Sequence, residues 1–360
     1  MRAAVILLFI AFSSAAQPDT TLIRIMAIQN DTGRVNELYK RGFAIRNIDP
    51  VKAFVYARSC EKEALECSSL KHLAKSYNLL GVLFYKKGEL GTAHNYHQKA
   101  LKLRRECGDE TGIAHSLTNL GNIFLDLKLF HKSEACYLEA LKIYEASKND
   151  RQKAACLLNL GALKQATKQM ESAKEFYQLA NKLAEHNNDY ETRCLCLNNL
   201  AEYYFYKGEN EASVGYNMDA LKLRNLMDNQ VDCADSYLNL GKNYIQMNDA
   251  PKAKMYLDMA YKIANQYDYF EARMEACKTY AWLYESKDNY AEAFHWLSEY
   301  NVMLDSLMQQ QDLEKSAYGL QDAVDAPIVK ESGGLKNKWM LLTLGAMMVF
   351  VAYFLTRYKR

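Results

Sequence analysis

The dipeptide Leu-Gly recurs along this chain at an interval of 40 residues. The dipeptide and its close variants occupy six slots: Leu80-Gly81, Leu120-Gly121, Leu160-Gly161, Leu200-Ala201, Leu240-Gly241 and Tyr280-Ala281. A segment of this length cannot bury an apolar face of its own, so neighbouring segments must complete each other's core. We therefore expect a solenoid of stacked repeats, with its function on a surface rather than in a central pocket.

Other positions keep the same phase as the glycine. Four residues before it and three after it, most side chains are apolar: Tyr77, Leu117, Leu157, Leu197, Tyr237, Cys277, and Phe84, Phe124, Tyr204, Tyr244, Tyr284, with Lys164 in the remaining place. This i, i+3, i+4, i+7 stripe predicts a first helix. Small residues twelve positions past the slot predict a closely packed second helix: Ala93, Ser133, Ala173, Ser213, Ala253 and Ala293. Gly88 and Gly208 indicate turns between the helices. The fold class is therefore all-α.

Together, the pattern Trp/Tyr-x-x-Leu-Gly-x-x-Tyr and the spaced alanines resemble the tetratricopeptide repeat. The resemblance covers residues 36–300 in about seven copies, of which the first is weaker and carries Gly42, Pro50 and Ala53. It implies a right-handed superhelix of helix-turn-helix repeats. The family usually repeats near 34 residues, so we interpret the longer interval as longer helices. The chain is similar to an extended subclass that includes kinesin light chains and the sensor regions of Bacteroidetes-type membrane-anchored regulators.

The N-terminus has the pattern of an export signal. Arg2 supplies a positive charge, residues 3–12 are apolar but too few to span a bilayer, and small residues 14–16 precede Gln17. We therefore expect a signal peptide over residues 1–16 and an N-terminal helical cap over residues 17–35. A buried helix is the alternative for the apolar segment.

The C-terminus has the pattern of a membrane anchor. Residues 339–356 contain no charged side chain and are flanked by basic residues on both sides, which is near the minimum for a transmembrane helix. Before this segment we expect a capping helix over residues 301–318 and a juxtamembrane linker over residues 319–338. With an exported N-terminus, the repeats would be periplasmic, the chain would cross the inner membrane once, and residues 357–360 would be a cytoplasmic tail.

Composition and motifs exclude several classes of function. The formal net charge of +2 argues against nucleic acid as the main partner. The sequence contains no Gly-rich phosphate loop and no His-Glu-x-x-His motif, so we expect no enzyme activity, no catalytic residues, no metal and no cofactor. Of the nine cysteines, most occupy small or apolar core positions. Only Cys67 and Cys107 come at helix ends where a disulfide between repeats is conceivable, and the sequence leaves that pairing open.

One polar column points to binding. Asn119, Asn159, Asn199 and Asn239 each stand two residues before the glycine slot. In the family that the chain resembles, this position faces the concave groove, where side-chain amides can bond an extended peptide backbone. The alternative is that these asparagines bond neighbouring helices and fix the repeat geometry. The same resemblance implies further groove residues: His115, Asn122, Asn198, Glu202, Lys242 and Trp282.

Two functions remain after these exclusions. In the first, the chain is a membrane-anchored scaffold whose groove binds a protein or peptide partner. In the second, it is the sensing half of a signalling system similar to histidine kinases or helix-turn-helix regulators, with its output on a separate chain or lost. The basic arrangement that some family members use to hold a peptide C-terminus is not reproduced, because Leu79, Asn119 and Asn159 occupy positions where a basic residue would be expected.

Overall fold

The structure is a computed structural model that describes residues 19–325, with side chains over residues 19–309. The described part contains fifteen α-helices and no strand. They are α2 (Thr20–Met26), α3 (Asp31–Ile45), α4 (Pro50–Glu66), α5 (Leu70–Lys86), α6 (Leu90–Glu106), α7 (Glu110–Asp126), α8 (Phe130–Ala146), α9 (Asp150–Ala166), α10 (Met170–His186), α11 (Tyr190–Tyr206), α12 (Asn210–Leu226), α13 (Gln230–Gln246), α14 (Ala250–Gln266), α15 (Phe270–Glu285) and α16 (Tyr290–Asp325). The predicted signal peptide and the predicted span over residues 339–356 lie outside the described residues.

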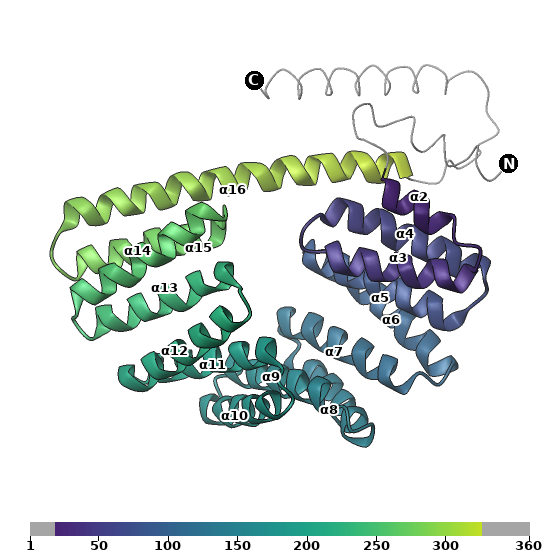
Figure 1. Cartoon of the computed structure of the whole chain (residues 1–360), viewed down its shortest axis with the longest axis horizontal. Coiled ribbons are helices and arrows are strands. Elements are labelled where there is room, and N and C mark those ends of the chain that lie inside the picture. The colour runs from purple at the N-terminus through teal and green to yellow at the C-terminus, as the bar shows by residue number, and fades with distance from the viewer. Residues whose placement is uncertain (1–18, 326–360) are drawn as a thin grey trace, which may run out of the picture. The chain divides into compact units, whose positions relative to one another are not determined.

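The helices stack as antiparallel hairpins (Figure 1). The chain divides into two units, residues 1–300 and residues 301–360, and the hairpins belong to the first. Each odd-numbered helix from α3 to α13 packs on the even-numbered helix that follows it, and each of these second helices packs on the next first helix. The fold is therefore an all-α helical repeat solenoid, as the periodicity of the sequence predicts.

The 40-residue interval follows from the helix lengths. From α4 to α14, every helix has 17 residues, and three residues connect it to the next. The expectation of longer helices is confirmed, because each hairpin is lengthened in its helices rather than in its turns.

From α4 onward, each turn between helices contains one residue in the left-handed backbone region. These residues recur every 20 positions: Ser68, Gly88, Gly108, Lys128, Lys148, Lys168, Asn188, Gly208, Asp228, Asn248, Asp268 and Asp288. The turn after α8 shows the geometry, because the amides of Lys148 and Asn149 donate to the carbonyls of Glu145 and Tyr144 at 3.1 and 2.9 Å. These bonds satisfy carbonyls that the end of the helix would otherwise leave unpaired. The left-handed residue thus reverses the chain within three residues.

The glycine slot allows close packing between the two helices of a hairpin. At Gly121 and Gly161, the facing residues are the fully buried Tyr137 and Tyr177. A Cβ atom at Gly161 would lie 2.6 Å from Cδ1 of the Tyr177 ring, well inside van der Waals contact. The slot is therefore small because an aromatic ring of the second helix occupies the space that a side chain would need.

The column of small residues completes this contact from the second helix. Ala93, Ala173 and Ala253 are fully buried there. Where serine replaces alanine, its hydroxyl donates to the carbonyl of the glycine slot, from Ser133 to Gly121 at 2.8 Å and from Ser213 to Ala201 at 2.7 Å. The buried serine hydroxyls thus have hydrogen-bond partners, which explains why the column accepts serine as well as alanine.

The last hairpin departs from the common register. In three earlier hairpins an aromatic residue of the second helix stacks on the residue three positions after the slot: Tyr96 on Phe84, Tyr216 on Tyr204, and Tyr256 on Tyr244, the last at 5.4 Å between centroids. In the last hairpin, Trp296 of α16 instead stacks on Tyr280, one residue before the slot, at 4.2 Å. The first turns of α16 therefore pack differently from the equivalent turns of α14.

The far end of α16 covers the segment expected as a capping helix. The helix runs without a break through residues 301–318 as a continuation of the last hairpin helix. It then continues to Asp325, seven residues into the segment expected as a linker over residues 319–338. A single glycine costs an α-helix only about 1 kcal/mol, so Gly319 does not end it. None of the described helices is both long and apolar enough to cross a bilayer.

All nine cysteines are free thiols. Cys67 and Cys107, the pair left open by the sequence, each follow the last residue of a second helix, and each thiol donates to a carbonyl three residues earlier, in Ala64 and Arg104. Cys60, Cys156 and Cys196 are fully buried, and burial raises the pKa of each thiol to about 12. Most cysteines therefore act as small apolar core residues.

Candidate peptide-binding surface

The first helices of the hairpins lie side by side in two runs: α3, α5, α7, α9 and α11 contact one another in sequence, as do α13 and α15. We refer to these first helices together as the wall. The predicted groove residues all lie on this wall: His115, Asn119 and Asn122 on α7, Asn159 on α9, Asn198, Asn199 and Glu202 on α11, Asn239 and Lys242 on α13, and Trp282 on α15. All are half-buried except Glu202, which is exposed. The two proposed roles for the asparagines can therefore be compared through their hydrogen bonds.

Asn119 bonds a neighbouring helix. Its side-chain amide donates to Oδ1 of Asn78 on α5 at 3.0 Å, and Asn78 is buried. Asn78 also interacts with the hydroxyl of Tyr39 on α3, whose pKa is raised by burial and partly lowered again by Arg104 and by this hydrogen bond. Asn119 thus helps to link three first helices. This is the alternative role, in which the asparagine fixes the repeat geometry.

Asn159, Asn199 and Asn239 behave differently. Within the described part of the chain, their side-chain amides make no hydrogen bond, and none of their polar atoms is fully shielded from solvent. Each therefore keeps a donor and an acceptor for an external partner. Three members of the column are consequently available for binding, while the fourth is engaged in the fold.

Some of the remaining predicted groove residues are also bonded within the fold, and others are not. Asn122 accepts from the hydroxyl of Tyr137 at 2.6 Å, so its carbonyl oxygen supports the hairpin. Lys242 forms an ion pair with Glu275 at 2.7 Å. Oδ1 of Asn198 and Nε2 of His115 are buried without a hydrogen-bond partner in the described structure. Burial lowers the pKa of His115, with a further lowering by Arg104, so its imidazole is neutral near pH 7.

An aromatic contact crosses the wall and was not predicted. The ring of Phe205 on α11 meets Trp282 on α15 edge to face, with 6.4 Å between centroids. One hairpin separates these helices, so the contact requires the wall to bend inward on this side. The sequence singled out Trp282 but not Phe205, because the column of Phe205 varies freely, with Gln165 and Ile245 as neighbours.

Two buried arginines lie between repeats and were also missed. Arg104 donates to the Gly112 carbonyl at 2.7 Å and to Ser116 Oγ at 2.8 Å, and Arg224 donates to Ser236 Oγ at 2.5 Å. Both are more than nine-tenths buried. Burial lowers the pKa of Arg104, an effect opposed by the charge of Asp109. The arginines join a second helix to the next first helix, so their role is in repeat packing.

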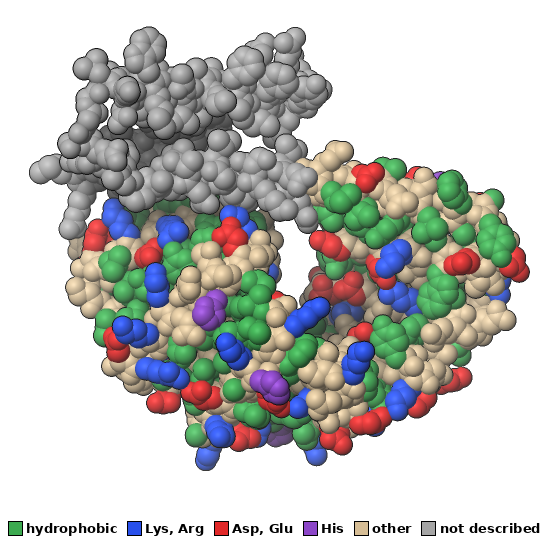
Figure 2. Space-filling view, turned by 180° about the vertical axis from the view of Figure 1, so that it is seen from behind, with side chains coloured by type: hydrophobic (Ala, Val, Ile, Leu, Met, Phe, Trp, Pro, Cys, Tyr) green, Lys and Arg blue, Asp and Glu red, His purple; other side chains and the backbone are tan. Residues whose placement is uncertain are grey.

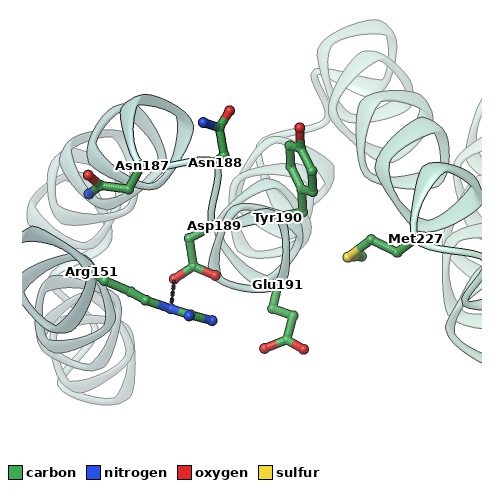
Figure 3. A pocket seen from close by; sticks show the side chains of 7 residues that line it. All are labelled: Arg151, Asn187, Asn188, Asp189, Tyr190, Glu191 and Met227. Atoms are coloured by element: carbon green, nitrogen blue, oxygen red, sulfur yellow. Dashed lines mark ion pairs between the residues drawn. The ribbon is translucent and has the colours of Figure 1, made fainter.

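A small pocket lies at one edge of the repeats (Figure 3). Its volume is about 220 Å³, and its lining consists of Arg151, Asn187, Asn188, Asp189, Tyr190, Glu191 and Met227. Asp189 is buried, accepts from the Thr192 hydroxyl at 2.8 Å and pairs with Arg151 at 3.3 Å. Because its central carboxylate is already satisfied as a helix cap, the pocket is a weaker candidate than the wall of first helices.

The surface charge is mixed. On the face shown in Figure 2, basic and acidic side chains are interspersed with hydrophobic ones. This face shows no basic stripe of the kind that attracts nucleic acid. The described residues also contain no group of three or more His, Cys, Asp or Glu side chains arranged to hold a metal ion.

Comparison with known families agrees with this architecture. Family models described as Tetratricopeptide repeat match residues 112–186, residues 73–109 and 193–225, and residues 234–267. The chain therefore carries tetratricopeptide repeats, all within the predicted range of 36–300. No curated protein matches the sequence.

Solved structures show the same fold at low sequence identity. The apo form of RapI is 14% identical with a TM-score of 0.60, covering 76% of this chain and 99% of that chain. A Rap protein complexed with Competence and Sporulation Factor is 14% identical with a TM-score of 0.57, covering 84% and 91%. A STAND protein with a tetratricopeptide repeat sensor from Pyrococcus horikoshii is 16% identical with a TM-score of 0.61, covering 82% and 46%. The chain thus shares the helical-repeat fold of these structures.

Proposed function

We propose that the wall of first helices binds an extended peptide or a protein segment, and that the chain is a membrane-anchored interaction scaffold without catalytic activity of its own. One observation carries the proposal: Asn159, Asn199 and Asn239 occupy the same position on consecutive first helices, and their side-chain amides are unbonded and reachable within the described structure. An amide pairs with either polar group of a peptide backbone, so a row of them can bind a strand with little dependence on its sequence.

The asparagine column itself supplies both the test variant and its control. The double variant Asn159→Ala, Asn199→Ala removes free amides, so partner affinity should fall while the free energy of unfolding stays within about 0.5 kcal/mol of the parent. Asn119→Ala instead leaves buried Asn78 without its donor, so it should destabilise by about 1 kcal/mol. Affinity for a captured partner and urea unfolding are measured on all three chains. Unchanged affinity of the double variant would remove the proposed role of the asparagine row.

The membrane anchor belongs to the same proposal and rests on the composition of residues 339–356. The arrangement is an inner-membrane chain with periplasmic repeats and a cytoplasmic tail. A reporter that is active only in the cytoplasm, fused after Arg360, should be active, and an export-dependent reporter at the same site should be silent. The reverse pattern would overturn this orientation.

A sensing role is the second candidate, as in the Bacteroidetes-type regulators that the sequence resembles. It is favoured by the continuity of α16, which runs unbroken to Asp325 and precedes the proposed membrane span in the sequence. A continuous helix can transmit a displacement of the repeats along its axis. If the adjacent reading frame encodes a kinase or a DNA-binding domain, this candidate gains support; a neighbourhood without any output domain counts against it.

A further inference from the structure

An aromatic cluster lies on α11, which carries the free Asn199, and on α15. Phe205 contacts Trp282 at 6.4 Å between ring centroids, and the adjacent Tyr206 contacts Phe205 at 5.7 Å. Phe205 and Trp282 are half-buried, whereas Tyr206 is 70% exposed. We refer to Phe205, Tyr206 and Trp282 as the aromatic shelf. An exposed tyrosine on a partly desolvated pair of rings offers apolar area that the fold itself does not cover.

The charges around the aromatic shelf determine what can bind there. Lys242, on the helix between Phe205 and Trp282, is paired with Glu275, and Lys207, next to Tyr206, is paired with Glu171 at 2.7 Å. Glu202 lies one turn before Tyr206, is exposed, and forms no ion pair within the described residues. Two lysines share each of these carboxylates, Lys242 and Lys278 on Glu275 and Lys174 and Lys207 on Glu171. Each lysine is thus already ion-paired, and the exposed feature that remains for a ligand is the aromatic rings, which favour an apolar group.

We propose that the aromatic shelf seats one large apolar side chain of an extended peptide whose backbone lies along Asn159, Asn199 and Asn239. This inference rests on the proposed function and adds to it the chemistry of the partner. The asparagines bind any backbone, whereas the shelf discriminates between side chains, because only an apolar one gains by burial against the three rings. Asn239 precedes Lys242 by one turn on α13, so backbone and side-chain contacts would fall on adjacent turns.

The test uses a defined set of probes. Short peptides of alternating serine and alanine, acetylated and amidated at their ends and labelled with a fluorophore, carry one central guest residue: Trp, Leu, Ser, Lys or Glu. Binding to the full-length chain is followed by fluorescence anisotropy. The Trp and Leu guests should bind about ten- to a hundredfold more tightly than the Ser guest, the range expected for burial of one large apolar side chain. The Glu guest should bind more weakly than the Ser guest.

Variants locate the preference on the shelf. Trp282→Ala and Phe205→Ala should each reduce the Trp-to-Ser affinity ratio to about threefold or less. The small preference that remains would come from apolar contact with the two rings that are still present. Tyr206→Ala should lower the ratio as well, and since this ring is 70% exposed, its loss leaves the fold intact. Leu226→Ala is the matched control, because Leu226 is 75% exposed at the end of a second helix, away from the wall, and the ratio should not change.

The outcomes separate the two proposals. Peptides that bind without preference for an apolar guest, or a Lys guest that binds best, would overturn the aromatic shelf and leave the asparagine row standing. A preference that survives all three shelf variants would also overturn it. If no peptide of the set binds, both the proposed function and this inference fall. The Asn159→Ala, Asn199→Ala chain should weaken all guests by the same factor and leave the ratio unchanged.

Discussion

The clearest consequence of the hairpin geometry concerns Gly161→Ala. The new Cβ atom would lie 2.6 Å from Cδ1 of Tyr177, about 1 Å inside van der Waals contact. The ring cannot easily yield, because Tyr177 is 1% exposed and its hydroxyl donates to Gln165 Oε1 at 2.6 Å. The substitution should therefore destabilise the chain, although alanine is the better helix former.

Two opposing effects set the magnitude. Replacing glycine by alanine inside a helix stabilises by about 1 kcal/mol through backbone entropy and helix propensity. Overpacking a rigid core by one methyl group costs about 1 to 3 kcal/mol. The net effect at Gly161 should be a loss of up to about 2 kcal/mol in the free energy of unfolding.

A second glycine isolates the packing effect. Gly215 lies inside α12 and is exposed, and beyond its own helix backbone no heavy atom lies within 4 Å of the position that a Cβ atom would take. Gly215→Ala should therefore stabilise by about 1 kcal/mol. Because the chemical change is identical, the difference between the two variants measures the clash alone. Urea unfolding followed by far-ultraviolet circular dichroism gives both values.

The result that would refute this reasoning is an equal gain in stability for both variants. It would mean that the Tyr177 ring does not occupy the space above Gly161. The sequence supplies a natural comparison, since the equivalent slot in the next repeat is Ala201 and the residue in the place of the tyrosine is the smaller Asn217.

Three further predictions concern single residues. Burial, with smaller contributions from Arg104 and His94, lowers the pKa of His97 from 6.5 to about 3. The free energy of unfolding should therefore fall by about 1 kcal/mol per pH unit below pH 6.5, because the unfolded chain takes up the proton. His97→Leu should flatten this slope in urea unfolding measured from pH 7 to 4. Lys148→Gly should raise the urea midpoint slightly, because its backbone φ of 53° strains a Cβ atom, and a lowered midpoint would contradict this. Iodoacetamide should label exposed Cys107 in the native chain but leave buried Cys156 unlabelled until urea is added, as mass spectrometry of the digest would show.

Much of the fold could be predicted because a repeat array is built from contacts between neighbours. The slot at Gly161, the small residue at Ala173 and the apolar stripe between them all recur at one spacing, and the structure confirms their packing. Where the pattern changes, the prediction loses accuracy. Trp296 occupies the position of earlier aromatic partners, yet it stacks one turn away on Tyr280.

The turns show a different limit. Gly88 and Gly208 were recognised as turn residues, but Lys128, Lys148 and Lys168 hold the same left-handed conformation and have no turn propensity of their own. Their conformation is imposed by the helices on either side, which must reverse within three residues to pack. A lysine in the sequence gives no indication of this, because the cause lies in the contact between the helices and not in the residue.

The amino-acid sequence by itself determined the all-α class, the pairing of helices and the 40-residue interval, since each follows from residues that meet within one hairpin or between adjacent ones. The tertiary structure decided which asparagine of the column is engaged and which are free, because Asn119 finds Asn78 across the wall while the equivalent neighbour of Asn159 is Thr118. It also decided that Phe205 meets Trp282. Contacts between helices that are a full hairpin apart depend on how the stacked repeats bend, and small rotations summed over several repeats set that bend.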